Sequence, residues 1–355
     1  MHHTDSSEAP RGMAARVLVP AHIDRLAATP PGDGHVAMFD GETMGTTWSV
    51  RCVLPPGEDA GQTESRLDAT IRAVLDEVIE QMSNWRDDSD VSRFNRAEAN
   101  TWVTVPRACF DVVEAALAVA RESGGAYDPS AGPLVDLWGF GLAPRRADSP
   151  SFDEVSAVRA RCGWQRIEAD RAGLRLYQAG GSALDLCAIA KGYAVDAVRD
   201  ALVASDIDHV LVEIGGELRG EGVKPDGMPW WVELETPPQE GAFALPPGVD
   251  LIALHGLSVA TSGDYRRYYV DKTDVRRAHT IDPRTGYPAS HALASVTVLH
   301  PSCMLADAWS TALTVLGPDA GMLLAQRKRL AARFLVRTPD GFRELTSPAY
   351  AAMLE

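Results

Sequence analysis

The sequence predicts a protein of mixed helices and strands, of either the α/β or the α+β class. Two spacings support this prediction: apolar residues recur at every second position in some segments and at every third or fourth position in others. Both kinds of segment alternate along the chain. With 355 residues, of which 45% are hydrophobic, the chain is long enough to bury a large core. No repeat with a period of about 20–50 residues is visible, so neither a solenoid nor a propeller is expected.

Ordered structure is expected to begin near Phe39. The first strand is predicted within 48–54, where apolar and more polar side chains alternate. The first helix is predicted over 64–83, because apolar residues recur there at the spacing of one helical face. These residues are Leu67, Ile71, Val74, Leu75, Val78 and Met82.

The same two spacings place the remaining elements. A short strand at 101–105 precedes a helix over 107–123, which Gly124 and Gly125 would end. Further helices are predicted over 190–204 and 303–316, and further strands at 209–214, 230–235, 251–255, 267–271, 293–299 and 332–337. Segments 141–151 and 236–249 are rich in Pro, Gly and Ala and are expected to be loops.

The charge of the chain narrows the classes of function. Lys and Arg number 34 and Asp and Glu number 49, which makes a formal net charge of −15. General binding to nucleic acid or to an anionic membrane needs clustered positive charge, so neither is expected. An acidic protein that handles a phosphorylated ligand would need a metal ion or local basic residues to offset the repulsion.

Residues 1–38 are expected to form a flexible N-terminal extension, because Pro, Gly and charged residues interrupt its apolar stretches. The segment lacks the continuous apolar core of a secretory signal. No run of about 18 apolar residues predicts a membrane-spanning helix. The expected location is therefore the cytoplasm, or the periplasm if an export signal was removed.

Several common catalytic signatures are absent from the sequence. It contains no G-x-x-x-x-G-K-[ST], no G-x-S-x-G, no H-E-x-x-H and no G-x-G-x-x-G. P-loop NTPases, α/β hydrolases, zincins and dinucleotide-binding dehydrogenases are therefore disfavoured. The five cysteines form no C-x-x-C pair, and we expect small buried residues rather than a zinc site or a disulfide framework. They are Cys52, Cys109, Cys162, Cys187 and Cys303.

Two glycine-containing segments combine polar groups in a way that suits ligand binding. The segment Met44-Gly45-Thr46-Thr47 lets the backbone approach a ligand closely, although by itself a strand-opening turn is the simpler interpretation. Residues 185–193 place Asp185 and Lys191 among small residues before a predicted helix, where a lysine can neutralise a phosphate. The alternative is a helix N-terminus with a solvated Lys191.

Further along the chain, two more sets of residues could either bind a ligand or have a purely structural role. The strand end at 214–217 turns on paired glycines, a feature that is as often structural as functional. Residues 260–268 and 279–286 combine Gly, Ser and Thr with His279, which directly precedes a predicted Asp-Pro-Arg-Thr-Gly turn. A histidine in this position is either a packed core residue or a proton carrier, and the density of polar residues around it favours the second role.

An otherwise apolar helix carries Asp307 and Thr311, which lie four residues apart and therefore on one helical face. Burying an unpaired carboxylate and hydroxyl among Ala, Leu and Val would be costly. An oxygen-preferring cation such as Mg²⁺ would satisfy both groups. The alternative is that Asp307 hydrogen-bonds locally and Thr311 bonds back to its own helix.

Taken together and in this order, the segments resemble the ApbE family of FAD:protein FMN transferases, from about Phe39 to the C-terminal strand. The matching pieces are MGTTW at 44–48, MSNWRDDSDVSRFN at 82–95, AYDPSAGPLVDLWGFG at 126–141, DLCAIAKGYAVD at 185–196, IGGEL at 214–218, TSGDYRRYY at 261–269, HTIDPRTGYP at 279–288 and ADAWSTAL at 306–313. Each piece alone has low specificity, whereas the ordered set is highly specific.

The resemblance implies an α+β fold related to the T-fold, with mixed sheets flanked by helices and two closely joined subdomains. Residues 39–355 would form this flavin transferase domain. The implied activity is Mg²⁺-dependent transfer of the FMN half of FAD to a Ser or Thr hydroxyl of a target flavoprotein, with release of AMP. Mg²⁺ would be held by the backbone carbonyl of Ala188 and the side chains of Asp307 and Thr311.

The resemblance also implies the residues that contact FAD. These are Met44, Trp85, Tyr127, Asp128, Pro129, Asp185, Lys191, Ser262, Gly263, Asp264, Tyr265, His279 and Ile281. Catalytic roles would fall to Asp307 through the metal, to Lys191 through neutralisation of charge, and to His279 through deprotonation of the acceptor hydroxyl or orientation of the diphosphate. Two alternatives share this site: an FAD-binding protein without transfer activity, and Mg²⁺-dependent hydrolysis of FAD to FMN and AMP.

Overall fold

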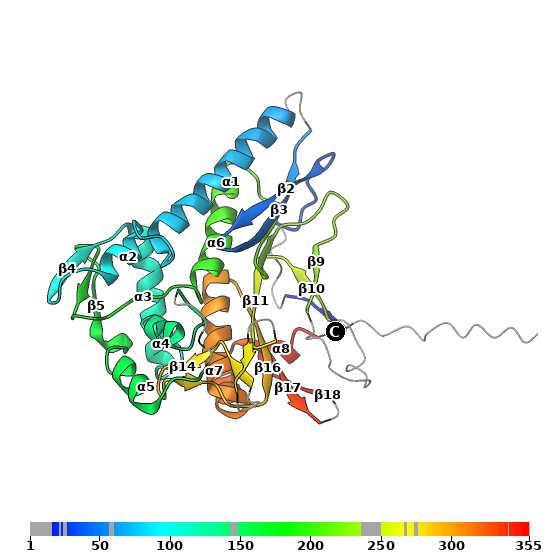
Figure 1. The fold of residues 1–355 in the computed structure, drawn as a ribbon. Helices are drawn as coiled ribbons and strands as arrows, with labels where there is room; N and C mark the ends of the chain where they lie inside the picture. The colour runs from blue at the N-terminus through cyan, green and yellow to red at the C-terminus, as the bar shows by residue number, and fades with distance from the viewer. Residues whose placement is uncertain are drawn as a thin grey trace, which may run out of the picture.

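The computed structural model describes residues 16–20, 23, 27–56, 60–142, 146, 148–235, 250–265, 268–272, 276–339 and 341–354. At its centre lies a sheet of eight strands in the order β18-β17-β16-β11-β8-β7-β3-β2, in which every neighbouring pair is antiparallel (Figure 1). In chain order these strands are β2 (His35–Thr43), β3 (Thr46–Leu54), β7 (Val210–Ile214), β8 (Glu217–Glu221), β11 (Leu257–Gly263), β16 (Leu293–His300), β17 (Ala331–Thr338) and β18 (Gly341–Thr346).

Three long helices cover one face of this sheet. They are α1 (Ala60–Met82), α6 (Ala190–Val203) and α7 (Cys303–Lys328), and α6 packs between the other two (Figure 1). The sheet packs against apolar residues on both of its faces. In strand β7, Val210 and Val212 belong to the large core beneath the helices, whereas Leu211 belongs to a second apolar cluster. This alternation follows from the two-residue period of a strand.

The second cluster lies under a smaller sheet in the order β1-β10-β9 and under the short helix α8 (Pro348–Ala351). The strands of this sheet are β1 (Arg16–Leu18), β9 (Trp230–Glu233) and β10 (Asp250–Leu254). Leu18 is fully buried there, so burial of apolar surface holds β1 in place. Part of the segment expected to be a flexible extension is therefore built into the fold, because residues 16–18 pair with β10 and β2 already begins at His35.

An ion network ties β1 to the C-terminal part of the chain. The carboxylate of Asp250 accepts hydrogen bonds from Arg16 Nε at 2.6 Å and from the Tyr350 hydroxyl at 2.8 Å. Arg333 Nε lies 3.4 Å from the same carboxylate, and Glu344 pairs with both arginines. Because Asp250 is only 2% exposed, these partners must compensate for its lost hydration.

Residues between α1 and α6 gather beside the helical layer (Figure 1). Their elements are α2 (Asp90–Asn95), β4 (Thr101–Thr104), α3 (Arg107–Glu122), α4 (Gly132–Leu137), α5 (Phe152–Arg159), β5 (Ile167–Asp170) and β6 (Arg175–Gln178). The large apolar cluster runs without interruption from α1, α6 and α7 into α3 and β6. A third, small cluster joins α4 and α5 to two hairpins, β12 (Tyr268–Val270) with β13 (Arg276–Ala278) and β14 (Ile281–Asp282) with β15 (Tyr287–Pro288).

The antiparallel main sheet decides between the two fold classes. An α/β fold would join parallel strands through crossover helices, whereas here the strands pair antiparallel and the long helices lie together on one face. The α+β prediction is confirmed. Among the described residues, no helix combines the length and the apolar character needed to cross a membrane.

The four predicted helices are present in the structure, whereas the shorter helices α2, α4, α5 and α8 were not predicted. The helices expected over 64–83, 107–123 and 190–204 correspond to α1, α3 and α6. The helix expected over 303–316 continues to Lys328, across non-helical backbone at Gly317 (φ 79°) that is followed by Pro318. The Gly317-Pro318 dipeptide interrupts the helix, because proline has no amide hydrogen to donate to the preceding turn. The helix then continues beyond Pro318 to Lys328.

Strand predictions located β3, β4, β7, β9, β10, β12, β16 and β17 and missed several others. Among the missed strands, β8 contains Glu217, Arg219 and Gly220, which do not follow the apolar alternation of a half-buried strand. The structure places no helix or strand in the described residues of 141–151. The predicted loop at 236–249 and residue 267 of a predicted strand lie outside the described residues.

Candidate active site

The first predicted site residue, Met44, sits in the hairpin between β2 and β3. Thr43 pairs with Thr46, so the turn consists of Met44 and Gly45, and both have positive φ values of 49° and 72°. Two-residue hairpins of this kind require positive φ, which glycine adopts freely. For a methionine this conformation costs about 1–2 kcal/mol. Such unfavourable backbone conformations concentrate at functional sites, which supports the role predicted for Met44.

The motif at 185–196 begins α6 and brings this helix against α7. Gly192 lies so close to α7 that a Cβ atom there would be 2.3 Å from the Cys303 carbonyl oxygen and 2.9 Å from Asp307 Cβ. The amide of Gly192 donates a hydrogen bond to Asp307 Oδ2 at 3.1 Å. This close approach places the predicted metal ligand Asp307 next to Lys191.

Replacing Gly192 with Ala is expected to destabilise the protein by about 1–3 kcal/mol, because the added methyl group must push α6 away from α7. The free energy of unfolding in urea measures this effect. Gly61→Ala is the matched control, since a Cβ atom at Gly61 in α1 would meet nothing within 4 Å. A Gly192→Ala protein as stable as the control would contradict the close approach.

Three charged side chains meet at this contact. Lys191 Nζ lies 2.6 Å from Glu217 Oε2 on β8; Glu217 is buried, whereas the Lys191 side chain is 28% exposed. Burial alone lowers the pKa of Lys191, but the carboxylates of Asp307 and Glu217 outweigh it and raise that pKa above its usual value. Burial raises the pKa of Glu217 to about 7, with Lys191 opposing the rise. Lys191 is thus paired with a carboxylate, which differs from the solvated lysine of the alternative interpretation.

Asp307 has no ion-pair partner of its own within the described part of the chain. It is 4% exposed, and burial raises its pKa, while Lys191 and the Gly192 amide lower it. With both carboxylates ionised, Lys191, Glu217 and Asp307 carry a net charge of −1. Asp307 is thus a buried carboxylate whose charge is offset only by Lys191, which Glu217 shares.

Thr311 lies one helical turn after Asp307 in α7. Its neighbours bond back to their own helix: Ser310 Oγ donates to the Asp307 carbonyl at 2.8 Å, and Thr314 Oγ1 donates to the Ser310 carbonyl at 2.8 Å. Within the described residues, the Thr311 hydroxyl makes no such bond. The alternative in which Thr311 is satisfied by its own helix is therefore not what the structure shows.

A buried tyrosine adjoins the same carboxylates. Tyr127 is 3% exposed, and its hydroxyl has no hydrogen-bond partner among the described residues. Burial, and then the charges of Asp307 and Asp185, raise its pKa well above the usual value. Since these charges act on the hydroxyl, the segments at 126–130, 185–192 and 306–311 converge on one place.

The turn at 128–130 joins the predicted flavin contacts to Asp185. The Pro129 carbonyl accepts a hydrogen bond from the Asp185 amide at 2.7 Å. Asp128 accepts from the amide and hydroxyl of Ser130 and from the Trp164 amide, at 2.7–3.0 Å. The carboxylate of Asp128 therefore holds the local turn together, and burial raises its pKa.

Trp85 and Cys187 lie on the open side of this region. Trp85 is 59% exposed, and Cys187 Sγ lies 3.6 Å from Oδ1 of the adjacent Asn84. The expectation that all five cysteines are buried is wrong for Cys187, which is exposed, and for Cys162, which is half-buried. The small-residue turn that begins α6 leaves Cys187 at the surface because Ile189 and Ala190 face the core instead.

The remaining predicted FAD contacts lie at the end of β11 and in the hairpins beyond it. Ser262 and Gly263 are paired with β16, and α7 packs on both strands. Asp264 is bound by Arg337 of β17, with Nη1 of Arg337 2.9 Å from Oδ2, so its carboxylate is anchored within the protein. Tyr265 follows it directly, and its ring lies against Gly263.

His279 lies between β13 and β14, with its ring 6.3 Å from that of Phe140 in an edge-on arrangement. Ile281, two residues later, is 5% exposed and belongs to the small apolar cluster with Trp138 and Tyr269. A contact between Ile281 and a ligand would therefore use its main chain. Packing of α7 on β11 connects the segment at 262–281 to the helix that carries Asp307.

A hollow of about 540 Å³ adjoins this region at Asp128. Its lining also includes Gly125, Trp164, Arg159 and Arg284, but neither Lys191 nor Asp307. The hollow and the cluster of Lys191, Glu217 and Asp307 are therefore separate features of this region.

The residues present fit the predicted cation. The Asp307 carboxylate and the Thr311 hydroxyl, one helical turn apart and without an ion pair or hydrogen bond respectively among the described residues, are oxygen donors of the kind that Mg²⁺ prefers. No group of three or more His, Cys, Asp or Glu residues in the described chain is arranged to hold a metal ion. Ala188, half-buried in the turn before α6, would add its carbonyl.

Two residues that sequence reasoning did not assign belong to this region. Glu217 pairs with Lys191, and Asp196 binds the first turn of α7. Both residues lie within motifs that carry the family resemblance, Glu217 in 214–218 and Asp196 in 185–196. Their partners, however, lie far away in the sequence. Neither pairing follows from local spacing.

Comparisons with known proteins show the family to which the chain belongs. A sequence profile described as the ApbE family matches residues 44–334. The FAD:protein FMN transferase of Vibrio cholerae is 37% identical over 321 residues, which is 89% of this chain and 92% of that protein. The protein of the same name from Haemophilus influenzae is 36% identical over 330 residues, or 90% and 92%.

Solved structures give the same result. The apo form of the flavinyl transferase ApbE of Pseudomonas stutzeri aligns with a TM-score of 0.80 at 40% identity, covering 90% of this chain and 97% of that one. The flavin transferase ApbE of Vibrio cholerae aligns with a TM-score of 0.81 at 36% identity, covering 90% and 99%. The family profile, the sequence relatives and the fold agree over most of the chain, which therefore belongs to the ApbE family.

Proposed function

We propose that this chain is an FAD:protein FMN transferase, which moves the FMN half of FAD to a Ser or Thr hydroxyl of a target flavoprotein and releases AMP in a Mg²⁺-dependent reaction. The observation that carries the proposal is the buried carboxylate of Asp307, which lies one turn from the Thr311 hydroxyl; among the described residues the carboxylate has no ion-pair partner and the hydroxyl makes no hydrogen bond. The names of the related proteins support the same activity.

The reaction is a displacement at phosphorus. The acceptor oxygen forms a bond to the FMN phosphorus, the bond from that phosphorus to the bridging oxygen breaks, and AMP leaves with that oxygen. Such reactions depend mainly on positioning and on neutralisation of charge. Asp307, Thr311 and the Ala188 carbonyl would hold Mg²⁺, which supplies positive charge to the diphosphate oxygens when bound.

Each residue then has a defined task. Lys191, held by Glu217, would present a fixed positive charge to the diphosphate. Tyr127 has a buried hydroxyl that can donate a hydrogen bond to a ligand atom, since burial keeps it protonated. His279 would accept the proton of the acceptor hydroxyl on a ring nitrogen. Trp85 and Met44 would contact the flavin from the exposed side.

A mass measurement tests the proposal. The full chain is incubated with FAD and a candidate acceptor domain, with Mg²⁺ or with EDTA, and the mass of the acceptor is determined. Transfer predicts an acceptor heavier by one FMN phosphodiester and an equal amount of AMP, only when Mg²⁺ is present. AMP without a heavier acceptor would indicate hydrolysis, and bound FAD without AMP would indicate a binding protein.

Replacing His279 with Ala is expected to lower the turnover of transfer by about 100-fold or more, while the Kd for FAD changes little, because proton transfer is lost but the FAD contacts remain. The rate is measured from the acceptor mass over time and the Kd from quenching of FAD fluorescence. His35→Ala is a control, since His35 lies on the edge strand β2 and is half-exposed. Equal losses of rate and affinity would make His279 a binding residue instead.

A further inference from the structure

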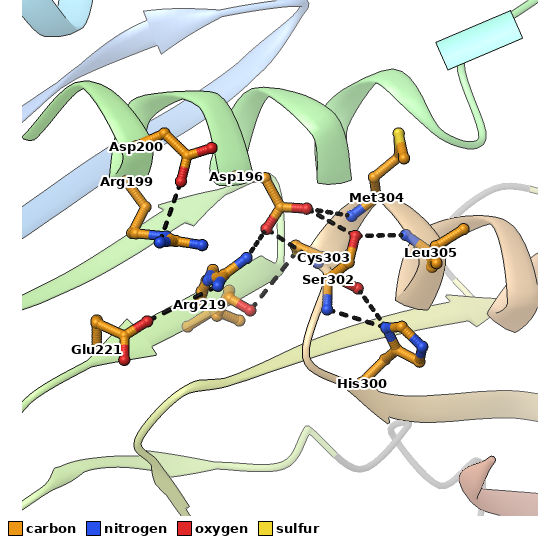
Figure 2. A network of polar contacts seen from close by, with 11 residues as sticks. Asp196, Arg199, Asp200, Arg219, Glu221, His300, Ser302, Cys303, Met304 and Leu305 are labelled. Carbon is orange, nitrogen blue, oxygen red and sulfur yellow. Dashed lines mark hydrogen bonds and ion pairs between the residues drawn. The ribbon is translucent and has the colours of Figure 1, made fainter. Parts of the chain in front are cut away.

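Asp196 forms a connection between three elements that the proposed site needs. Its carboxylate accepts hydrogen bonds from Arg219 Nη1 on β8 at 2.5 Å and from Ser302 Oγ, just before α7, at 2.9 Å (Figure 2). It also accepts from the amides of Cys303 and Met304 at 3.0 Å each. A carboxylate on the first amides of a long helix satisfies donors that have no partner within that helix, and it suits the helix dipole.

Two ion pairs join strand β8 to helix α6, and the acidic residue lies on the strand in one pair and on the helix in the other. Glu217 of the strand pairs with Lys191 of the helix, and Arg219 of the strand pairs with Asp196 of the helix. The strand residues are two positions apart and so share a face, separated by roughly 6.7 Å. The helix residues are five positions apart, a rise of about 7.5 Å. The rises along the two elements are similar, and both pairs form in the structure although five positions turn the helix by roughly 140°.

The alternating charges specify one register. If α6 moved by one pair along β8, Lys191 would face Arg219 or Asp196 would face Glu217, and like charges would meet at a poorly hydrated contact. Both members of the second pair are nearly buried, with 14% and 11% of their side chains exposed. Hydration therefore does little to relieve such a mismatch.

The same helix is tied to α7 at two points one turn apart. Asp196 binds the amide of Cys303, and the amide of Gly192 binds Asp307. Both steps, 192 to 196 and 303 to 307, are four residues, so the two helices run in opposite directions here with matched turns. Fixing the first turn of α7 on Asp196 therefore fixes where the oxygens of Asp307 and Thr311 stand relative to Lys191.

We propose that Asp196, with Arg219, is a positioning residue for FMN transfer: it sets the register of α7 against α6 and β8, and so the geometry of the predicted Mg²⁺ donors. The proposal rests on the proposed function, since it concerns the site of that reaction. Asp196 touches neither the predicted donors nor the ligand, and it acts through the main chain of α7. Loss of the partners that orient metal ligands commonly lowers metal affinity by about 10–100-fold.

The test is the concentration of Mg²⁺ at half-saturation in wild type and in Asp196→Asn. It is measured with the full chain in two ways: by the change in FAD fluorescence without an acceptor, and by FMN transfer with one. In Asp196→Asn, the half-saturating Mg²⁺ is expected to rise about tenfold in both measurements, while the Kd for FAD in EDTA changes less than twofold. Asp200→Asn is the matched control, since Asp200 on the same helix pairs only with Arg199 and is 65% exposed (Figure 2).

The outcomes separate this proposal from the proposed function. The positioning role alone would be overturned by two results together. In that case the wild type transfers FMN with Mg²⁺, and Asp196→Asn has a lower melting temperature but an unchanged Mg²⁺ requirement. A wild type that shows neither transfer nor a response to Mg²⁺ would overturn both. If Asp196→Asn does not fold, Ser302→Ala replaces it, because this substitution removes one hydrogen-bond donor to Asp196. A rise of about threefold in the half-saturating Mg²⁺ concentration supports the proposal, and an unchanged Mg²⁺ requirement overturns it.

Discussion

Asp307→Asn is expected to reduce FMN transfer by about a thousandfold, which corresponds to ~4 kcal/mol in activation free energy. The substitution removes the charge that would hold Mg²⁺ but keeps the shape of the side chain, and its amide oxygen can still accept the Gly192 hydrogen bond. The acceptor mass measurement over time gives the rate. The expected loss is largest here because Asp307 is the one carboxylate in the predicted donor set.

The same variant is expected to be at least as stable as the wild type. Burial raises the pKa of Asp307 in the folded protein, so its ionised form is disfavoured by folding. A carboxyl with a raised folded-state pKa costs stability once the pH exceeds its unfolded-state value, and that cost is present at neutral pH. Asparagine removes the cost, and thermal unfolding at pH 7 measures it.

Asp319→Asn is the control for both measurements, because Asp319 lies on the second half of α7 and is exposed. It is expected to keep both the rate and the melting temperature of the wild type. Full transfer activity of Asp307→Asn at ordinary Mg²⁺ would contradict the metal assignment. Loss of activity together with loss of folding would contradict the expected stability of this variant and would mean that the Asp307 charge stabilises the fold.

Asp250→Ala is expected to lower the free energy of unfolding by about 3–5 kcal/mol, because it leaves buried cationic and hydroxyl groups without their partner. Arg333, only 3% exposed, and Arg16 each lose one of their two carboxylate partners and keep Glu344, whereas the buried Tyr350 hydroxyl loses its hydrogen bond to Asp250. Urea denaturation of the full chain measures the change. The effect would show that residues 16–18 contribute to stability, although they lie far from the predicted site.

A surface ion pair provides the comparison for Asp250. Asp226 lies 3.4 Å from Lys224, and its side chain is 60% exposed. Exposed pairs of this kind contribute about 0–1 kcal/mol, so Asp226→Ala should change the stability little. Similar losses for the two variants would mean that the Asp250 network is weaker than its burial and hydrogen bonds indicate.

Local spacing predicted the elements that bury one face. Helices α1, α3 and α6 have apolar residues on one side. This pattern predicts that the apolar side is buried, whichever part of the protein packs against it. The strand β8 escaped prediction because its inward residues are Glu217 and Arg219, whose burial is possible only through pairing with α6. Residues 16–18 escaped it because a three-residue strand carries too short a pattern to recognise.

For the site, the sequence alone determined that Asp307 and Thr311 share a helical face, since a four-residue step does so in any α-helix. The ordered motifs, and not any single spacing, determined the family. Lys191 was expected to act on a phosphate as an independent charge, and the structure instead pairs it with Glu217. The partner of a buried charge depends on which elements pack together, and this information is not local in the sequence.

Only the tertiary structure decided how α6, α7 and β8 meet. The close approach of Gly192 to α7, the Gly192–Asp307 hydrogen bond and the binding of Asp196 to the start of α7 join residues 107 to 115 positions apart in the chain. The sequence determined the elements, the donor types and the family, because these depend on short-range periodicity and on motif order. The geometry and charge balance of the site depend on long-range packing, which places groups of opposite charge together where water cannot screen them.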